Sequence, residues 1–146
     1  MCEEFKKQIA QKKPVFGCLL TLPCPEAAEI LSETGFDFLW IDGEHSALDV
    51  GTIQQMIQAV GGRCPTLVRI PAAEELWVKK ALDTGCAGIV APQINSAAQA
   101  QQVVEWSLYP PRGRRSVGVS RAHRYGMSFG TYVEDSHKST VIVLQI

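Results

Sequence analysis

The sequence predicts an α/β fold in which parallel strands alternate with helices. Short, continuous apolar runs, of the kind expected for strands covered on both faces, recur along the chain. Segments with apolar residues at helical spacing separate these runs, and the ends of three consecutive runs fall near positions 42, 70 and 92. This steady pitch indicates repeated βα units that are joined by right-handed crossovers.

The first part of the chain predicts two helices and one strand. Residues 4–13 form a short amphipathic pattern that Pro14 ends, and the apolar residues 15–20 then predict the first strand. Pro25 is placed to begin the next helix, and Gly35 is placed to end it.

The middle of the chain predicts three further strands, each followed by a helix. The strands are expected at residues 36–42, 66–70 and 87–92. The helices are expected at about residues 50–60, 74–84 and 96–106, with Gly61 and Gly85 as stops and Ser96 as a cap.

Residues 109–139 interrupt this alternation. The segment is rich in Gly, Pro and Arg and predicts one long loop, which in a compact domain is usually functional or part of an interface. Residues 140–146 predict a fifth strand. Since a complete barrel has eight strands and about 250 residues, we expect residues 1–146 to be a single domain that forms a partial (β/α)8 TIM barrel, truncated after strand five.

Composition limits the kind of partner that the chain can bind. Lys and Arg total 14 against 15 for Asp and Glu, which gives no general electrostatic basis for binding nucleic acid or an anionic membrane. No segment approaches the roughly 18 apolar residues of a membrane span, and the N-terminus lacks the apolar run of a signal peptide. The five cysteines contain no CxxC pair and are expected to be reduced core thiols. We therefore expect a cytoplasmic protein that acts on a small molecule.

Charged and polar residues gather at the predicted carboxyl ends of the strands, where parallel α/β folds bind ligands. Asp42, Glu44 and His45 end or follow the second strand, Arg69 ends the third, and Gln145 lies in the fifth. His45 is a candidate general base because imidazole titrates near neutrality, and Asp42 could hold its other ring nitrogen in the correct tautomer. A surface or helix-capping histidine fits the same pattern.

Arg69 ends an otherwise apolar strand, where an unpaired guanidinium would be costly. It therefore needs an anion, either a substrate carboxylate or phosphate or a protein carboxylate such as Asp42 or Glu44. A purely structural ion pair is an alternative. Glu44 is a candidate to orient a metal-bound water, or else a solvated loop residue.

Two groups of basic residues in the predicted loop have two interpretations. They could recruit an anionic substrate, or they could belong to a solvated loop that packs against a neighbouring subunit. The groups are Arg112, Arg114 and Arg115, and Arg121, His123 and Arg124.

The order of several motifs from Val15 onward resembles the HpcH/HpaI family of metal-dependent class II pyruvate aldolases. This family includes 2,4-dihydroxyhept-2-enedioate aldolase and 2-keto-3-deoxy sugar-acid aldolases. The motifs are FDFLWIDGEH, LVRIP, ALDTGCAGIVAPQINSAAQA, YPPRGRRSVGVSRAHRYG and VLQI. The resemblance implies a (β/α)8 barrel that cleaves or condenses 2-keto acids to or from pyruvate and an aldehyde, through a metal-stabilised pyruvate enolate.

The resemblance also implies roles for individual residues. His45 matches the catalytic base, Asp42 its supporting carboxylate, Arg69 the arginine that holds the pyruvyl carbonyl or enolate oxygen, and Gln145 a glutamine near the bound pyruvate. The family's metal ligands are a Glu directly after the QI of strand five and an Asp in a later loop. We therefore expect the ligands for Mg²⁺, Mn²⁺ or Co²⁺ to lie beyond Ile146, and none within the chain. Complete family members are expected to be homo-oligomers, specifically hexamers.

Three functional hypotheses follow. The first is a class II pyruvate aldolase, represented by an N-terminal portion that is inactive alone because its metal site is incomplete. The second is a different phosphate-handling (β/α) barrel that uses the arginine-rich loop. The third is a non-catalytic remnant, stabilised by self-association or by a partner that pairs with its exposed strand edges.

Overall fold

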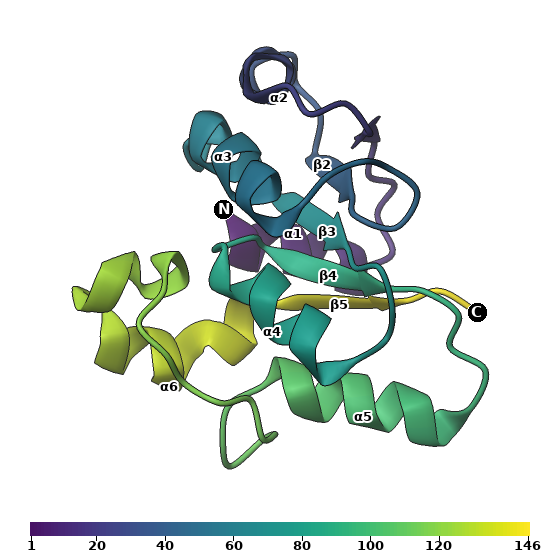
Figure 1. Ribbon diagram of the computed structural model, residues 1–146, viewed down its shortest axis with the longest axis vertical. Helices are drawn as coiled ribbons and strands as arrows, with labels where there is room; N and C mark the ends of the chain where they lie inside the picture. The colour runs from purple at the N-terminus through teal and green to yellow at the C-terminus, as the bar shows by residue number, and fades with distance from the viewer.

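The computed structural model describes residues 1–146 and contains one sheet of five parallel strands in sequential order. The strands are β1 (Gly17–Leu20), β2 (Phe38–Asp42), β3 (Thr66–Arg69), β4 (Gly88–Ala91) and β5 (Val141–Leu144). Each strand pairs with the next one along the chain (Figure 1). This order is that of a partial (β/α)8 barrel, as predicted.

The helices are α1 (Cys2–Ala10), α2 (Pro25–Ser32), α3 (Val50–Val60), α4 (Glu75–Asp83), α5 (Ala97–Ser107), the 3₁₀ helix η1 (Arg121–Gly126) and α6 (Phe129–Ser139). Helices α2, α3, α4 and α5 each follow a strand and cover one face of the sheet. The predicted helix signals act where expected: Ser96 caps α5 by accepting from the Gln99 N–H, and Gly61 ends α3 in the left-handed conformation. Helices α2 and α3 pack on each other, while α4 and α5 lie below them in Figure 1.

The two faces of the sheet differ in chemistry because side chains alternate along each strand. The outer face packs under the helices in the main apolar core, which contains Leu39, Ile41 and Val68. The inner face carries a smaller apolar cluster in which Leu67 joins Phe5 of α1. Asp42 and Arg69 lie on this inner face, at the carboxyl ends of β2 and β3, where the register pairs them.

The prediction of one loop over residues 109–139 is wrong, because the segment contains η1 and α6. Helix α6 contains few apolar residues, and besides the adjacent η1 it contacts parts of the chain that are distant in sequence. Tyr132 packs edge-on against Tyr109, and Lys6 of α1 donates to the His137 carbonyl oxygen at 2.7 Å. Tertiary packing thus stabilises a helix that the local sequence does not predict.

Neither Arg115 nor His123 belongs to a solvated loop. The Arg115 side chain is fully buried and donates to Asp83 at 2.7 Å. His123 is also fully buried; its Nδ1 accepts from the Gly126 N–H at 3.0 Å, and its Nε2 lies 2.6 Å from the Gly118 carbonyl oxygen. Both interpretations of these two residues are therefore wrong, since neither a solvated nor a substrate-recruiting side chain can be enclosed in this way.

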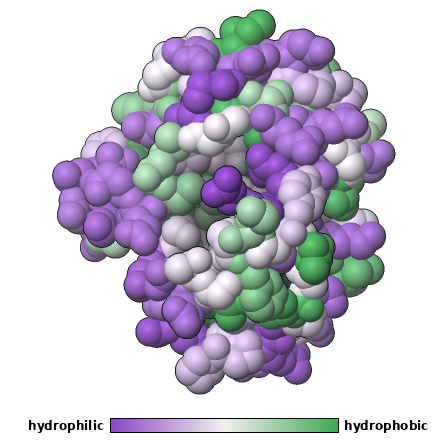
Figure 2. All heavy atoms as spheres, turned by 90° about the vertical axis from the view of Figure 1, so that its left-hand side faces the viewer, coloured by the Kyte–Doolittle hydropathy of each residue, from purple (hydrophilic) through white to green (hydrophobic).

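The region around η1 and the start of α6 exposes several large hydrophobic side chains. These are Val117, Val119, Tyr125, Met127 and Phe129. Figure 2 shows the face seen from the left of Figure 1, on which hydrophobic side chains gather in patches among hydrophilic ones. Exposed apolar patches mark candidate interfaces. None of the helices has the length and apolar character needed to span a membrane, and all five cysteines are free.

Candidate active site

The structure brings together the charged residues that were expected at the ends of β2 and β3. Arg69 Nε donates to Asp42 Oδ1 at 2.9 Å, and Arg69 Nη2 donates to Asp42 Oδ2 at 2.7 Å. The Asp42 side chain is 2% exposed and that of Arg69 15%. This is a two-point arginine–carboxylate pair, which fixes orientation as well as charge.

The pair is ionised. Hydrogen bonds from Arg69 lower the pKa of Asp42 to about 2, although burial opposes this shift, and the backbone N–H groups of His45 and Glu44 lower it further. The same hydrogen bonds raise the pKa of Arg69. A charged arginine is therefore held in a fixed place at the carboxyl end of the sheet.

The loop after β2 folds tightly against the end of β3. The backbone N–H groups of Glu44 and His45 donate to Asp42 Oδ1 at 3.0 and 3.2 Å, and the Gly43 N–H donates to the Arg69 carbonyl oxygen at 2.8 Å. A Cβ atom at Gly43 would lie 2.7 Å from that carbonyl oxygen. Only glycine permits this close approach of the two backbones.

His45 lies beside the pair, but the predicted contact between its ring and Asp42 is absent. The His45 side chain is 71% exposed, and its Nε2 lies 3.6 Å from Glu44 Oε1. The oxygens of Asp42 are occupied by Arg69 and by backbone N–H groups. The expectation that Asp42 sets the tautomer of His45 is therefore wrong in this structure; Asp42 positions His45 through the main chain.

Glu44 is not the solvated loop residue that one interpretation expected. Its side chain is 8% exposed, and its Oε2 lies 3.3 Å from Arg69 Nε. This buried oxygen accepts no hydrogen bond from the chain. Arg69 thus compensates its charge without hydrogen bonding to it, and Glu44 Oε2 can still accept a hydrogen bond from a ligand or a water molecule.

Gln145 reaches the same place from the end of β5. Its Oε1 lies 3.5 Å from Arg69 Nη1, while the other two guanidinium nitrogens face Asp42. Nη1 is thus the arginine nitrogen without a carboxylate partner. The structure unites residues from β2, β3 and β5 around it, as the predicted barrel requires.

No three His, Cys, Asp or Glu side chains in the chain lie together as a group that could hold a metal ion. The two carboxylates of the site, Asp42 and Glu44, both face the Arg69 guanidinium. Its positive charge opposes a second cation at this position. The residues of this chain therefore do not fit a metal centre by themselves.

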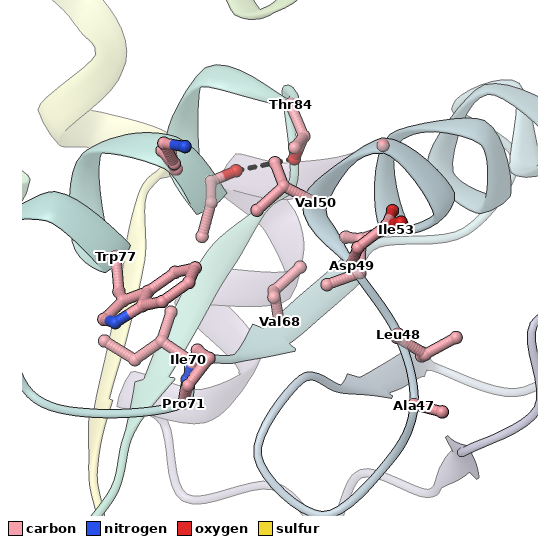
Figure 3. A pocket seen from close by; sticks show the side chains of 13 residues that line it. Ala47, Leu48, Asp49, Val50, Ile53, Val68, Ile70, Pro71, Trp77 and Thr84 are labelled. Atoms are coloured by element: carbon pink, nitrogen blue, oxygen red, sulfur yellow. Dashed lines mark hydrogen bonds between the residues drawn. The ribbon is translucent and has the colours of Figure 1, made fainter.

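The largest cavity lies on the other side of the sheet. It has a volume of about 600 Å³ and opens between α3 and α4, with Val68 and Ile70 as its floor and Trp77 as one wall (Figure 3). Val68 belongs to the outer, helix-covered face, whereas Arg69 points to the inner face. The cavity is mainly apolar and lacks a convergent set of charged groups, so we place the candidate site at Arg69.

A smaller recess of about 330 Å³ adjoins the ion pair on the inner face. Its lining includes Trp40 and Arg69. Trp40 was not identified from the sequence because it is one of several bulky residues in an apolar run. A signal was nevertheless present, since a residue two positions before Asp42 in a strand shares its face.

A sequence model described as HpcH/HpaI aldolase/citrate lyase matches residues 16–146. The chain belongs to this family. The family resemblance drawn from the IDGEH and YPPRGRRS motifs is thereby confirmed, and aldol cleavage is supported as the general chemistry of the family.

Relatives and solved structures agree with this assignment. The hydroxypyruvate/pyruvate aldolase of Roseobacter denitrificans is 38% identical over 145 residues, covering 97% of this chain and 56% of the relative. The 4-hydroxy-2-oxovalerate aldolase of Rhodococcus jostii is 34% identical over 143 residues, covering 97% and 55%. The crystal structure of an HpcH/HpaI aldolase/citrate lyase family protein from Burkholderia cenocepacia J2315 matches with a TM-score of 0.92 at 29% identity, covering 99% of this chain and 59% of that one. The chain spans about half the length of the curated relatives it matches.

Proposed function

We propose that this chain carries the keto-acid half of an aldolase site, which cleaves or forms 2-keto acids through a pyruvate enolate. The observation that carries the proposal is the anchored Arg69. Asp42 holds two of its guanidinium nitrogens, while Nη1 is left toward Gln145. Relatives whose names include pyruvate and 2-oxovalerate aldolases support a small keto acid as the substrate class.

In this proposal Arg69 binds the keto acid through its Nη1 edge. The guanidinium is already oriented by Asp42 and Glu44 before any ligand arrives. A preorganised cation stabilises the negative charge that develops on the enolate oxygen without a cost of reorganisation at that moment. Gln145 lies beside the same edge and would hold the ligand there.

His45 is the proposed base, which removes or returns a proton at the methyl carbon of pyruvate. Its side chain is exposed, and its backbone N–H is tied to Asp42. An accessible imidazole on an anchored loop can reach a ligand that Arg69 holds. Glu44, whose Oε1 lies 3.6 Å from His45 Nε2, is the carboxylate closest to the ring and takes the supporting role first expected of Asp42.

The family resemblance implies a divalent ion, Mg²⁺, Mn²⁺ or Co²⁺, which when bound would stabilise the enolate as a Lewis acid. Since the residues of this chain do not form such a site, we propose that its ligands lie in the part of the relatives' length that this chain does not span. The 146-residue chain is then expected to lack turnover by itself. A homo-oligomer, hexameric in complete family members, belongs to the same proposal.

Deuterium exchange into the methyl group of pyruvate tests this function. A form of the protein that also contains the family's metal ligands should exchange the methyl protons in D₂O with Mg²⁺ or Mn²⁺, and His45→Ala should abolish the exchange. Exchange that survives His45→Ala unaltered would remove His45 from the mechanism. Robust metal-dependent exchange by the 146-residue chain would contradict a metal site outside it.

A non-catalytic, self-associating chain is the second candidate. The observation that favours it is that β1 and β5 are each paired on one side only, so both present an open strand edge. Because both candidates include self-association, light scattering distinguishes them only together with a pyruvate-binding measurement. Self-association that buries both edges, together with absence of pyruvate binding, would favour this second candidate.

A further inference from the structure

On the inner face of the sheet, the Trp40 ring lies next to the Arg69 guanidinium. The distance from Arg69 Cζ to the ring centroid is 5.8 Å. A guanidinium within about 6 Å of an aromatic centroid is attracted to the face of the ring. Trp40 shares this face with Asp42 because the two residues are two positions apart in β2. The guanidinium is therefore held at its edge by Asp42 and supported by the ring of Trp40.

A hydrogen bond from the indole Nε1 cannot be the reason for a tryptophan at position 40. Its Nε1 is buried and has no acceptor in the chain. An unpaired buried N–H is unfavourable, and a phenylalanine or leucine would avoid it. Among the aromatic side chains, the face of the tryptophan indole attracts a cation most strongly. The contact with Arg69 is the interaction that uses this property.

Trp40 and Arg69 also line the recess of about 330 Å³ beside the candidate site. The other lining residues are Gly17, Cys18, Leu19 and Phe38. Arg69 is the charged group of this otherwise apolar recess. A ligand whose oxygen binds Arg69 would thus place its carbon atoms against Trp40 and its apolar neighbours.

We propose that Trp40 is a positioning residue of the candidate site, which fixes the plane of the Arg69 guanidinium and walls the space for the carbon chain of the substrate. A two-point ion pair still allows the guanidinium to tilt about the axis that joins it to Asp42, and the ring contact removes that freedom. The substrate class that fits is a small 2-keto acid with an apolar methyl or methylene group beside the keto carbon. This inference rests on the proposed function.

The chain offers a matched control away from the site. Arg114 Cζ lies 5.7 Å from the ring centroid of Trp106, and Trp106 Nε1 is likewise buried without an acceptor. Arg114, however, is 57% exposed and pairs with Glu105 at 3.7 Å. Changes at Trp106 therefore remove the same kinds of contact without touching the candidate site.

The first experiment measures pyruvate binding to the 146-residue chain from the broadening of the pyruvate methyl NMR signal, with and without Mg²⁺. Loss of a cation–π contact is expected to weaken binding by roughly 2- to 30-fold. Trp40→Leu should show this loss, Trp40→Phe a smaller one, and Trp106→Leu none. Affinity in Trp40→Leu and Trp40→Phe equal to that of the parent chain would overturn the inference, as would an equal loss in Trp106→Leu.

Tryptophan fluorescence reports the contact between Trp40 and Arg69 independently of any ligand. In a Trp77→Phe/Trp106→Phe chain, Trp40 is the remaining indole fluorophore. Adding Arg69→Met should shift the Trp40 emission maximum, because the charge over the ring is removed. An unchanged spectrum would contradict the contact between Trp40 and Arg69. If the emission shifts but the parent chain does not bind pyruvate, the proposed function fails while the placement of Trp40 against Arg69 is supported.

Discussion

Arg69 and Arg115 are both largely buried beside an aspartate, yet they are built for different tasks. Arg69 pairs with Asp42, lines the inner recess and keeps Nη1 beside the amide of Gln145. Arg115 pairs with Asp83 and is enclosed, with its Cζ 4.7 Å from the ring centroid of Tyr109. Both arginines have an ion pair and an aromatic neighbour. The open edge of Arg69, rather than its pairing, supports the proposal that it binds the substrate.

The enclosed arginine should have the largest effect on stability. Arg115→Ala would remove the ion pair with Asp83 and the contact with Tyr109. We expect the free energy of unfolding to fall by about 3 kcal/mol. This value is at the lower end of the range for breaking a buried ion pair, because Asp83 is partly exposed. Urea denaturation measures this loss. Arg112→Ala replaces an exposed arginine of the same segment and should change stability by less than about 0.5 kcal/mol. Equal effects of the two substitutions would show that Arg115 is not a structural arginine.

The pair at the candidate site should appear as a pH dependence of stability. Since the pKa of Asp42 is lowered to about 2, its contribution is present above the unfolded pKa near 4 and is lost as the pH falls toward 2. The shift corresponds to about 2 kcal/mol. Chemical denaturation between pH 5 and pH 2 should show this loss in the parent chain and a smaller one in Asp42→Asn. The same acid dependence in both chains would contradict the ionised pair.

Substitution of Arg114, the exposed neighbour of Arg115, should have the smallest effect on stability. Arg114 stacks on Trp106 at 5.7 Å and pairs with Glu105 at 3.7 Å, but its side chain is 57% exposed. Such contacts contribute at most about 1 kcal/mol in water. Arg114→Met should therefore lower the thermal midpoint much less than Arg115→Ala does in the same scan. A larger shift for Arg114→Met would reverse the comparison.

The sequence was sufficient to predict the strand order and the placement of Asp42 and Arg69 at the ends of neighbouring strands, but not which anion pairs with Arg69. Both follow from the regular pitch of βα units, which places the ends of neighbouring parallel strands side by side. The absence of a contact between Asp42 and the His45 ring could not be predicted, because residue spacing does not reveal that Arg69 and backbone N–H groups occupy the carboxylate. Helix α6 and the buried Arg115 were also beyond prediction, since long-range packing decides both.

The central claim, that Arg69 and its neighbours form the keto-acid site, is tested most directly by titrating pyruvate into ¹⁵N-labelled chain. The indole N–H signals of Trp40, Trp77 and Trp106 report on the inner recess, the large cavity between α3 and α4, and the matched control. We predict saturable shifts for Trp40 and for the backbone of Gly43 and Glu44, with Trp77 and Trp106 unmoved. Shifts centred on Trp77, with Trp40 unchanged, would place the ligand in the large cavity and contradict the account.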